Sequence, residues 1–343
     1  MRLATPRWWY ERAGAPMPIT RALLRPAAWI WTWETRRRIA RGQPYEPGAP
    51  VVCVGNLTLG GSGKTPVVRA IAARFAAQGR RVHVLTRGYG GRLKGPVRVD
   101  LRTHTAADVG DEALMLARDA PVWVSRDRAA GAAAAVAAGA ELVVMDDGHQ
   151  NPSLAKALSL VVVDGETRGK DWPFGDGQVF PAGPMREPLG DGLSRADAVV
   201  LLLPADLEAP DPRLVTLLRE RPMLVARLTP AAPPPPGPQL GFAGIGKPWK
   251  MERALQAAGC DLVDFAPFPD HARYDERTLT FLARRAAALG AGLVTSEKDW
   301  VKLPPAWQGR VVAWPVEARF EDPAALDRLL APALVRAQGS AGP

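Results

Sequence analysis

A glycine-rich loop constrains the fold more than any other feature of this sequence. The stretch from Gly55 to Thr65 reads GNLTLGGSGKT, follows a run of valines and precedes a helical pattern. Glycines let backbone N–H groups turn toward an anion without a Cβ in the way, and the N-terminus of the following helix favours negative charge. The sequence therefore predicts a strand, a phosphate-binding loop and a helix in succession.

The loop residues predict contacts with a nucleoside triphosphate. We expect Lys64 to reach the β and γ phosphates and the Thr65 hydroxyl to bind Mg²⁺. The pattern G-x-x-x-x-G-K-[ST] asks for glycine where Thr58 stands, but the strand, the GKT and the helix are in place. The alternative is a glycine-rich turn without a ligand. The predicted nucleotide-binding residues are Thr58, Leu59, Gly60, Gly61, Ser62, Gly63, Lys64 and Thr65.

Apolar runs alternate with alanine-rich helical stretches after Gly42. The runs that read as strands are PVVCVGN, RVHVLTRG, PVWVS, ELVVMDD, LSLVVVDG and ADAVVLLLP. Continuous apolar runs, rather than strict alternation, are typical of strands buried on both faces. We therefore expect an α/β fold of the P-loop NTPase type with a mostly parallel sheet.

Composition divides the chain further. Residues 1–42 are expected to form a basic, tryptophan-rich helical segment and residues 43–229 the core domain. The stretch TPAAPPPPGPQ cannot continue a helix or a strand, so residues 230–238 are interpreted as a stiff linker. Residues 239–330 would then form a second, smaller α/β lobe, and residues 331–343 a disordered tail.

The N-terminal segment carries most of the positive charge. The chain has a net charge of +9, and its first 41 residues hold nine arginines against two glutamates, a net +7. Because the rest of the fold carries little excess charge, this distribution argues against a nucleic-acid partner. The two cysteines, Cys53 and Cys260, lie far apart and form no metal or disulfide pattern, which favours a reducing cytosolic setting.

The same segment contains five of the eleven tryptophans. Tryptophan beside arginine is typical of a membrane interface. Pro26 suits the first turn of a helix that runs to about Arg41, with Trp29, Ile30 and Trp33 on one face. The apolar stretch is too short to span a bilayer and no signal-peptide cleavage site follows it. We expect a membrane-associating helix; the alternative is a helix packed on its own domain with a solvated basic face.

An acidic pair follows one of the predicted strands. The run ELVVM ends in Asp146 and Asp147. Two adjacent carboxylates repel each other unless a cation lies beside them, so we expect them to hold Mg²⁺. An ordinary strand-to-turn Asp-Asp-Gly is the alternative. The phosphate loop and the acidic pair together predict binding of a nucleotide with Mg²⁺, a property that switches, motors and kinases share. The guanine-binding motif N-K-x-D is absent from the sequence, which disfavours a GTPase.

Several stretches together resemble the tetraacyldisaccharide 4'-kinases (lipid A 4'-kinases) of Gram-negative bacteria. They span most of the chain, and the GYGG, AGP-x-REP and TSEKD blocks are more specific than the loop alone. The stretches are VGNLTLGGSGKTP (54–66), LTRGYGGR (85–92), VGDEALML (109–116), DDGHQ (146–150), FPAGPMREP (180–188), FPDHARY (268–274) and TSEKDWVKL (295–303).

The resemblance implies a kinase at the cytoplasmic face of the bacterial inner membrane, peripheral or monotopic. It would move the γ-phosphate of ATP to the 4'-hydroxyl of an acylated glucosamine disaccharide 1-phosphate lipid. The family pattern makes Asp111 the base, places Glu112 near the metal and makes His271 the assisting group. From the residues alone, Asp111 could instead cap a helix and His271 could be an ordinary loop histidine.

Three more residues are candidates for contacts with the lipid substrate. Arg186 and Arg87 are cations on predicted loops, where a guanidinium could meet a phosphate or form only a surface ion pair. His149 follows the acidic pair and could contact lipid or cap a turn. Ala272 stands where the family often has a second histidine, so His271 carries its assignment alone.

A competing function is a nucleotide-dependent switch or binding protein without lipid kinase activity. A switch needs no base aimed at an acceptor hydroxyl, so Asp111 discriminates between the two. Glu297 and Lys298 belong to the family's late signature, but the sequence assigns them no role. It indicates no protein partner either.

Overall fold

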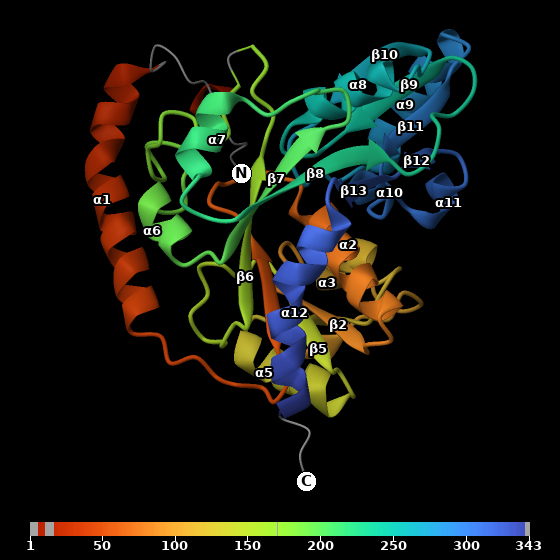
Figure 1. The fold of residues 1–343 in the computed structure, drawn as a ribbon. Helices are drawn as coiled ribbons and strands as arrows, with labels where there is room; N and C mark the ends of the chain where they lie inside the picture. Colours follow the sequence, from red (N-terminus) through yellow and green to blue (C-terminus); the bar gives the residue numbers. More distant parts are fainter. Residues whose placement is uncertain (1–5, 11–16, 170, 340–343) are drawn as a thin grey trace.

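The computed structural model describes residues 6–10, 17–169 and 171–339. The predicted fold class is confirmed, with a large, mostly parallel sheet covered by helices and a smaller lobe built on its own sheet (Figure 1). Residues 1–5 and 11–16 of the predicted N-terminal segment lie outside the described residues, as do residues 340–343 of the predicted tail. None of the helices described is both long and apolar enough to cross a membrane.

The main sheet contains all the strands predicted from apolar runs. Its strands are β1 (Val51–Gly55), β2 (Val82–Thr86), β3 (Val97–Arg98), β4 (Val122–Val124), β5 (Leu142–Asp146), β6 (Leu158–Asp164), β7 (Ala198–Pro204), β8 (Met223–Pro230) and β13 (Val316–Phe320). Their spatial order is β13-β8-β7-β6-β1-β5-β2-β4-β3. The strands from β8 to β4 run parallel, whereas β13 and β3 pair antiparallel at the two edges. The carboxyl ends of the parallel strands therefore meet at one edge of the sheet.

Helices cover both faces of this sheet because its strands are apolar on both sides. In β1, Val52 and Val54 pack with α2, whereas Val51 and Cys53 pack with α5. The first face carries α2 (Lys64–Ala77), α3 (Ala106–Val109), α4 (Asp111–Leu116) and α12 (Pro323–Gly339); the second carries α5 (Arg128–Ala137), α6 (Leu189–Ser194) and α7 (Pro212–Leu218).

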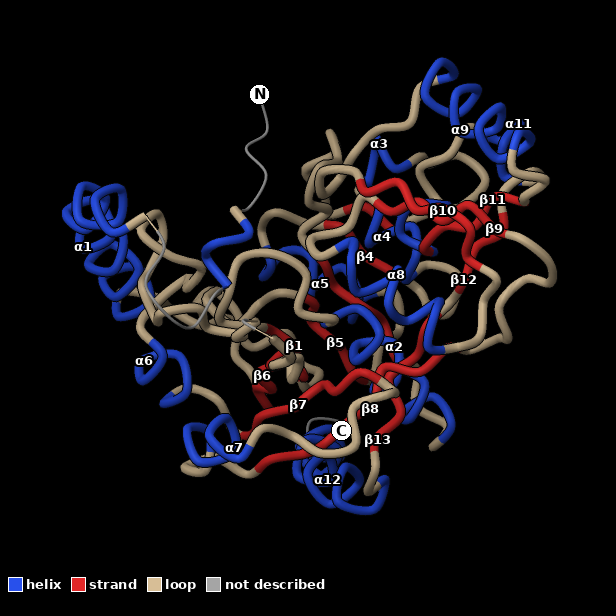
Figure 2. Tube along the Cα trace, turned by 90° about the horizontal axis from the view of Figure 1, so that it is seen from above, coloured by secondary structure: helices blue, strands red, loops and turns tan. Residues whose placement is uncertain are grey.

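The smaller lobe is a parallel sheet with its own core. Its elements are β9 (Gln239–Ala243), α8 (Pro248–Ala257), β10 (Leu262–Pro267), α9 (Glu276–Ala288), β11 (Gly292–Ser296), α10 (Glu297–Trp300), α11 (Pro305–Gln308) and β12 (Val312–Trp314), in the strand order β10-β9-β11-β12. Figure 2 shows this lobe on the side of the main sheet opposite α1 (Pro18–Ala40).

The C-terminal boundaries differ from the predicted ones. After β12 the chain returns to the main sheet as β13, which pairs with β8, and α12 then packs on that sheet and reaches Gly339. The predicted second lobe therefore ends too late, and the tail predicted from residue 331 continues a helix. The physical reason is the spacing of Leu326, Leu330 and Ala333, which places three apolar side chains on one buried face.

The N-terminal helix begins earlier than predicted. Pro18 occupies its first turn, where the missing N–H breaks no bond, and Pro26 lies inside the helix. Ala28 packs on the core beside α6, while Trp29, Ile30 and Trp33 are exposed, as the predicted grouping on one face requires. A short 3-10 turn, η1 (Arg7–Tyr10), precedes α1.

Replacing a buried side chain of α12 tests whether the C-terminal helix belongs to the core. We expect Leu330→Ala to lower the free energy of unfolding by about 2–5 kcal/mol, because the fully buried side chain leaves a cavity. Val335→Ala, at an exposed position of the same helix, should change it by less than about 0.5 kcal/mol. Urea unfolding measures both, and equal effects would contradict the packing of α12 on the sheet.

Candidate active site

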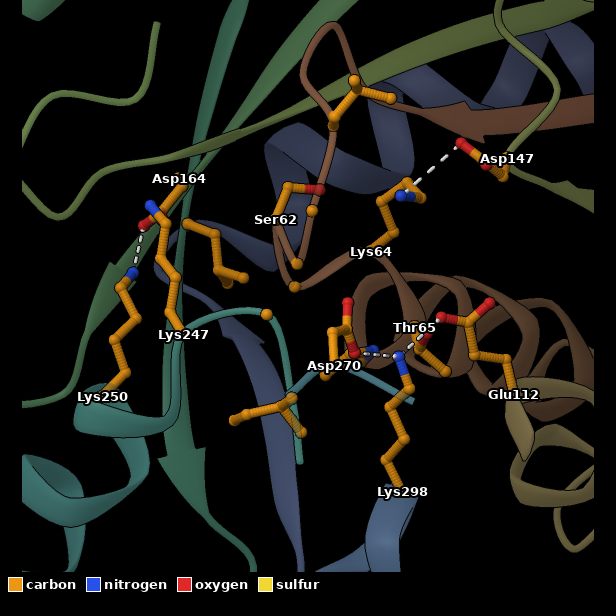
Figure 3. A pocket seen from close by; sticks show the side chains of 18 of the residues that line it. Ser62, Lys64, Thr65, Glu112, Asp147, Asp164, Lys247, Lys250, Asp270 and Lys298 are labelled. Atoms are coloured by element: carbon orange, nitrogen blue, oxygen red, sulfur yellow. Dashed lines mark hydrogen bonds and ion pairs between the residues drawn. The ribbon is translucent and has the colours of Figure 1, made fainter. Parts of the chain in front are cut away.

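A large cleft lies between the two lobes. Its volume is about 1570 Å³, more than the 300–1,000 Å³ that is usual for one small ligand. Residues 59–65 of the glycine-rich loop line it, together with residues of β5, α4, α8 and α10 or of the turns beside them (Figure 3). The cleft therefore has room for a nucleotide and for part of a second substrate.

The loop between β1 and α2 has the backbone of a phosphate site. Gly60 and Gly63 have φ values of 90° and 76°, which favour glycine, and a Cβ at Gly63 would lie 2.3 Å from Leu202. Asn56 Nδ2 donates to the Ser62 hydroxyl (2.9 Å) and holds the loop from within. Thr58 is not among the residues that line the cleft, and its carbonyl accepts a hydrogen bond from Arg186 (3.0 Å).

The two carboxylates at the end of β5, Asp146 and Asp147, have different surroundings and different pKa values. Asp147 accepts a hydrogen bond from Arg186 (2.8 Å) and lies 3.5 Å from Lys64 Nζ. Burial opposes ionisation, but these two cations hold the pKa of Asp147 below its usual range. Asp146 is buried without a cation that balances it. Burial, reinforced by the nearby Glu112, raises its pKa to about 7.

One oxygen of Asp146 can accept a metal. Oδ2 lies 3.2 Å from the Thr86 hydroxyl, whereas Oδ1 has no hydrogen-bond partner in the structure. Thr65 lines the cleft, and so does Asp147, the residue after Asp146. No group of three or more metal-binding side chains occurs in the described ranges. Mg²⁺ needs no such group, because it is usually held by one or two carboxylates together with water and phosphate oxygens.

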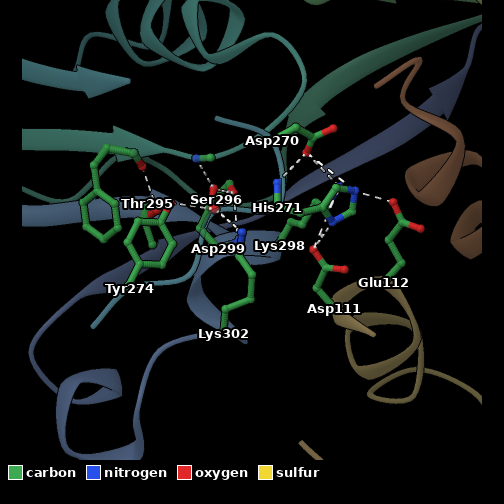
Figure 4. A network of polar contacts seen from close by, with 12 residues as sticks. Asp111, Glu112, Asp270, His271, Tyr274, Thr295, Ser296, Lys298, Asp299 and Lys302 are labelled. Carbon is green, nitrogen blue, oxygen red and sulfur yellow. Dashed lines mark hydrogen bonds and ion pairs between the residues drawn. The ribbon is translucent and has the colours of Figure 1, made fainter. Parts of the chain in front are cut away.

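A carboxylate–imidazole pair joins the two lobes. Asp111 begins α4, His271 lies in the loop after β10, and His271 Nδ1 is 2.9 Å from Asp111 Oδ2 (Figure 4). The base and the assisting group that the family resemblance implies are thus in contact across the lobe interface. Burial alone would raise the pKa of Asp111, but the hydrogen bond from His271 and the charge of Lys298 lower it to about 2.

Lys298, to which the sequence assigned no role, lies at the centre of this site. Its Nζ is 3.3 Å from both Glu112 and Asp270 and 3.5 Å from His271 Nε2. Burial opposes its charge, but the surrounding carboxylates raise the pKa of Lys298 above its usual range. The preceding residue, Glu297, pairs with Arg69 of α2 (2.6 Å).

The three predicted lipid contacts have different environments. Arg87 is exposed and lines the cleft, whereas Arg186 also lines it but is bonded to Asp147 and to the Thr58 carbonyl. His149 is not available to a substrate. Its ring is buried, with one nitrogen 2.9 Å from the Ser159 hydroxyl and the other 2.8 Å from the Gly192 carbonyl.

Sequence reasoning also missed residues of the cleft. Tyr89, in the GYGG block, packs against His271 with ring centroids 5.1 Å apart. Asp164 ends β6 and pairs with Lys247 and Lys250 of the smaller lobe (Figure 3). A signal existed for Asp164, since it ends a buried parallel strand just as Asp146 does.

The parallel sheet, the phosphate loop and the acid at the end of the adjacent strand define a nucleotide-binding protein of the P-loop class. Comparison with known proteins narrows the class. The sequence model of the family described as tetraacyldisaccharide-1-P 4'-kinase (LpxK) matches residues 20–335, and the chain belongs to this family.

Relatives and a solved structure agree with this assignment. The tetraacyldisaccharide 4'-kinase of Caulobacter vibrioides is 68% identical over 330 residues, covering 96% of this chain and 98% of the relative. That of Rhodospirillum centenum is 51% identical over 338 residues, covering 97% of each. The crystal structure of LpxK from Aquifex aeolicus in complex with ATP has the same fold, with a TM-score of 0.69 at 24% identity over 92% of this chain and 99% of that one.

The buried His149 predicts a pH dependence of stability. Burial lowers its pKa to about 4 from 6.5. Below about pH 6.5 the His149 imidazole binds a proton in the unfolded chain but not in the native state, so stability is lost as the pH falls toward 4. Between about pH 7 and pH 5 this removes about 2 kcal/mol.

Urea unfolding of wild type and His149→Gln at both pH values measures this effect. The variant lacks the titrating group, so its free energy of unfolding should fall by about 2 kcal/mol less than that of wild type. His104→Gln, at a partly exposed histidine of a turn, is the control and should retain the wild-type pH dependence. Identical pH dependence in wild type and His149→Gln would contradict the buried, neutral state.

Proposed function

We propose that the protein transfers the γ-phosphate of ATP to the 4'-hydroxyl of tetraacyldisaccharide 1-phosphate, a step of lipid A biosynthesis. The contact between Asp111 and His271 carries this proposal, since His271 lines the cleft together with the phosphate loop. The family supplies the acceptor, since its members are named for this reaction. A nucleotide switch is not favoured, because it would have no use for a base opposite the phosphates.

The loop supplies the donor site. Backbone N–H groups between Gly60 and Thr65 and the N-terminus of α2 would bind the ATP phosphates. Lys64 lies 3.5 Å from Asp147 and could exchange that partner for phosphate oxygens. Its charge would then neutralise the γ-phosphate as it leaves ADP.

Mg²⁺ is the metal that these residues fit. The Thr65 hydroxyl and Asp146 Oδ1 would hold it, because Asp146 Oδ1 has no other partner and a cation would favour its ionised form. Asp147 would act from beside the metal, since Arg186 and Lys64 already bind it. Glu112 is near Asp146 and is paired with Lys298. When bound, Mg²⁺ supplies charge neutralisation on the phosphates.

Asp111 is ready to act as a base. Its low pKa keeps the carboxylate ionised, and His271 orients it. As the acceptor oxygen forms a bond to the γ-phosphorus, the bond to the β,γ-bridging oxygen breaks and ADP leaves. The hydroxyl proton passes to Asp111, and the neighbouring imidazole shares it. A carboxylate of low basicity suffices because phosphoryl transfer needs little proton removal early in the reaction.

Arg87 is the better placed of the two predicted phosphate contacts. It and Arg126 are exposed, line the cleft and form no ion pair among the described residues, whereas Arg186 is occupied. We assign Arg87, assisted by Arg126, to the 1-phosphate of the acceptor, because a free guanidinium fork matches phosphate oxygens.

We further propose that α1 binds the cytoplasmic face of the bacterial inner membrane peripherally. Trp29 and Trp33 are 72% and 60% exposed, and Arg25, Arg37 and Arg38 of the same helix are exposed as well. The helix is attached to the core through the hydrogen bond from the Trp31 indole to the Arg186 carbonyl (2.9 Å) and the ion pair of Arg36 with Asp191 (2.6 Å). Exposed indoles with guanidinium groups suit anionic headgroups.

A transfer assay tests the kinase proposal. Protein, γ-labelled ATP, Mg²⁺ and tetraacyldisaccharide 1-phosphate are incubated in detergent micelles, and label in the lipid is measured. Asp111→Asn should lower kcat by about 10²–10⁴-fold, the usual contribution of a general base. Lys64→Ala should also abolish most transfer, because it removes the cation of the phosphate loop.

Two further variants sharpen this assay. Arg87→Ala should raise KM for the lipid and leave KM for ATP unchanged, since only the acceptor would contact it. Asp100→Asn, outside the residues that line the cleft, should retain wild-type activity. ATP hydrolysis by wild type with no label in the lipid would reject the kinase assignment in favour of a switch.

Binding to vesicles tests the role of α1. We expect the double variant Trp29→Ala, Trp33→Ala to bind anionic phospholipid vesicles at least about tenfold more weakly, because burial of each large apolar side chain is worth about 1.5–3 kcal/mol. Phe281→Ala is the matched control: it removes an aromatic group that is 61% exposed on α9 of the smaller lobe and should leave binding unchanged. Equal binding by wild type and the double variant would refute the membrane proposal.

A further inference from the structure

His271 is held in a backbone conformation that needs support. Its φ is 58°, in the left-handed region that non-glycine residues seldom occupy. Such a conformation persists only where the surroundings over-determine it. The His271 N–H donates to the Gly244 carbonyl (3.1 Å) and lies 3.0 Å from Asp270 Oδ1. Gly244, which follows β9, is therefore the support from outside the loop.

Gly244 is itself fixed by a buried carboxylate. Its N–H donates to Asp299 Oδ2 (3.0 Å), so one residue links the carboxylate on α10 to the backbone of His271. A side chain at this position has no room, since a Cβ would lie 2.8 Å from the Tyr274 hydroxyl and 3.0 Å from the Pro269 carbonyl. The contact therefore depends on close approach of backbone to backbone.

Asp299 also holds the other end of the His271 loop. Its Oδ1 accepts a hydrogen bond from the Tyr274 hydroxyl (2.8 Å), three residues beyond His271, and pairs with Lys302 Nζ (2.6 Å). Its Oδ2 accepts a second bond from the Ser296 hydroxyl (2.6 Å). Figure 4 shows these contacts to the left of the pair of His271 and Asp111. The Asp299 side chain is 0% exposed, so it cannot touch a substrate.

Burying a carboxylate costs desolvation free energy, and apolar residues of similar volume often stabilise a protein as well as a buried ion pair does. Here the position of the carboxylate matters: the same anion accepts hydrogen bonds from Gly244, which supports the His271 backbone, and from Tyr274, at the end of the His271 loop. Lys298, the neighbour of Asp299 on α10, contacts the His271 ring. Consecutive residues of α10 thus hold the backbone and the ring of His271.

We propose that Asp299 is a positioning residue that, through Gly244 and Tyr274, sets the loop presenting His271 to Asp111. This inference rests on the proposed kinase function for its kinetic test, but its structural consequence can be measured without turnover. Asp299 acts through His271 and makes no contact with the reacting atoms.

The kinetic test uses Tyr274→Phe, which keeps the shape of the side chain and removes one of the hydrogen bonds to Asp299. We expect kcat for lipid phosphorylation to fall about tenfold, with KM for ATP within about twofold, because misplacing a reacting group lowers kcat and spares remote binding. Asp299→Asn should lower kcat further. If Asp299→Asn does not fold, Tyr274→Phe decides alone.

Two controls separate positioning from general stability. Thr295→Val removes another buried hydroxyl of the same lobe, which donates to the Phe242 carbonyl (2.7 Å), and should lose similar stability without losing kcat. Adding Tyr274→Phe to His271→Ala should cause no further loss of kcat, because Tyr274 would act on the reaction only through His271. Equal losses of kcat in Thr295→Val and Tyr274→Phe, or additive losses with His271→Ala, would overturn the proposal.

Histidine NMR provides the readout without turnover. The chain has four histidines, so the imidazole signal of His271 can be assigned by its absence in His271→Ala. Tyr274→Phe should shift this signal and leave that of His149 in place. An unmoved His271 signal refutes the positioning role. If wild type transfers no phosphate to lipid while the signal shifts as expected, only the kinase assignment fails.

Discussion

The site depends on one constraint, the parallel register of β6, β1, β5 and β2. Parallel strands place all their carboxyl ends at one edge of a sheet, so residues far apart in the sequence become neighbours there. The phosphate loop follows β1, Asp146 ends β5, Thr86 ends β2 and Asp164 ends β6. The smaller lobe closes over this edge, and the cleft between the lobes contains the residues that the proposed reaction requires.

Pairing with cations distinguishes the carboxylates at this edge of the sheet. Asp147 has Arg186 and Lys64, and Asp164 has Lys247 and Lys250, so both carboxylates are balanced. Asp146, beside Thr86 of β2, has an oxygen without a hydrogen-bond partner and a raised pKa. In the interior an unbalanced carboxylate is costly, and a divalent cation removes that cost. Neighbouring acids of one motif can therefore serve different purposes.

Much of the fold and of the site could be predicted because it follows local rules. Apolar runs identified the buried strands, and the glycines and GKT identified the phosphate loop. Family motifs predicted that Asp111 and His271 act together, and in the structure His271 Nδ1 lies 2.9 Å from Asp111 Oδ2. The predictions failed where packing decides: His149 is enclosed by Ser159 and Gly192, and α12 extends through the predicted tail.

The sequence by itself determined the fold class, the phosphate loop and the family, since each depends on residue types at short spacing. Only the tertiary structure decided that Asp147 is paired with Arg186 while Asp146 Oδ1 has no hydrogen-bond partner. It also decided that Lys298 contacts the ring of His271, whereas Asp299 accepts a hydrogen bond from the Gly244 N–H. The physical reason is that the ionisation state and the bonding of a charged side chain depend on the groups around it. Those groups come from strands and loops that only the folded chain brings together.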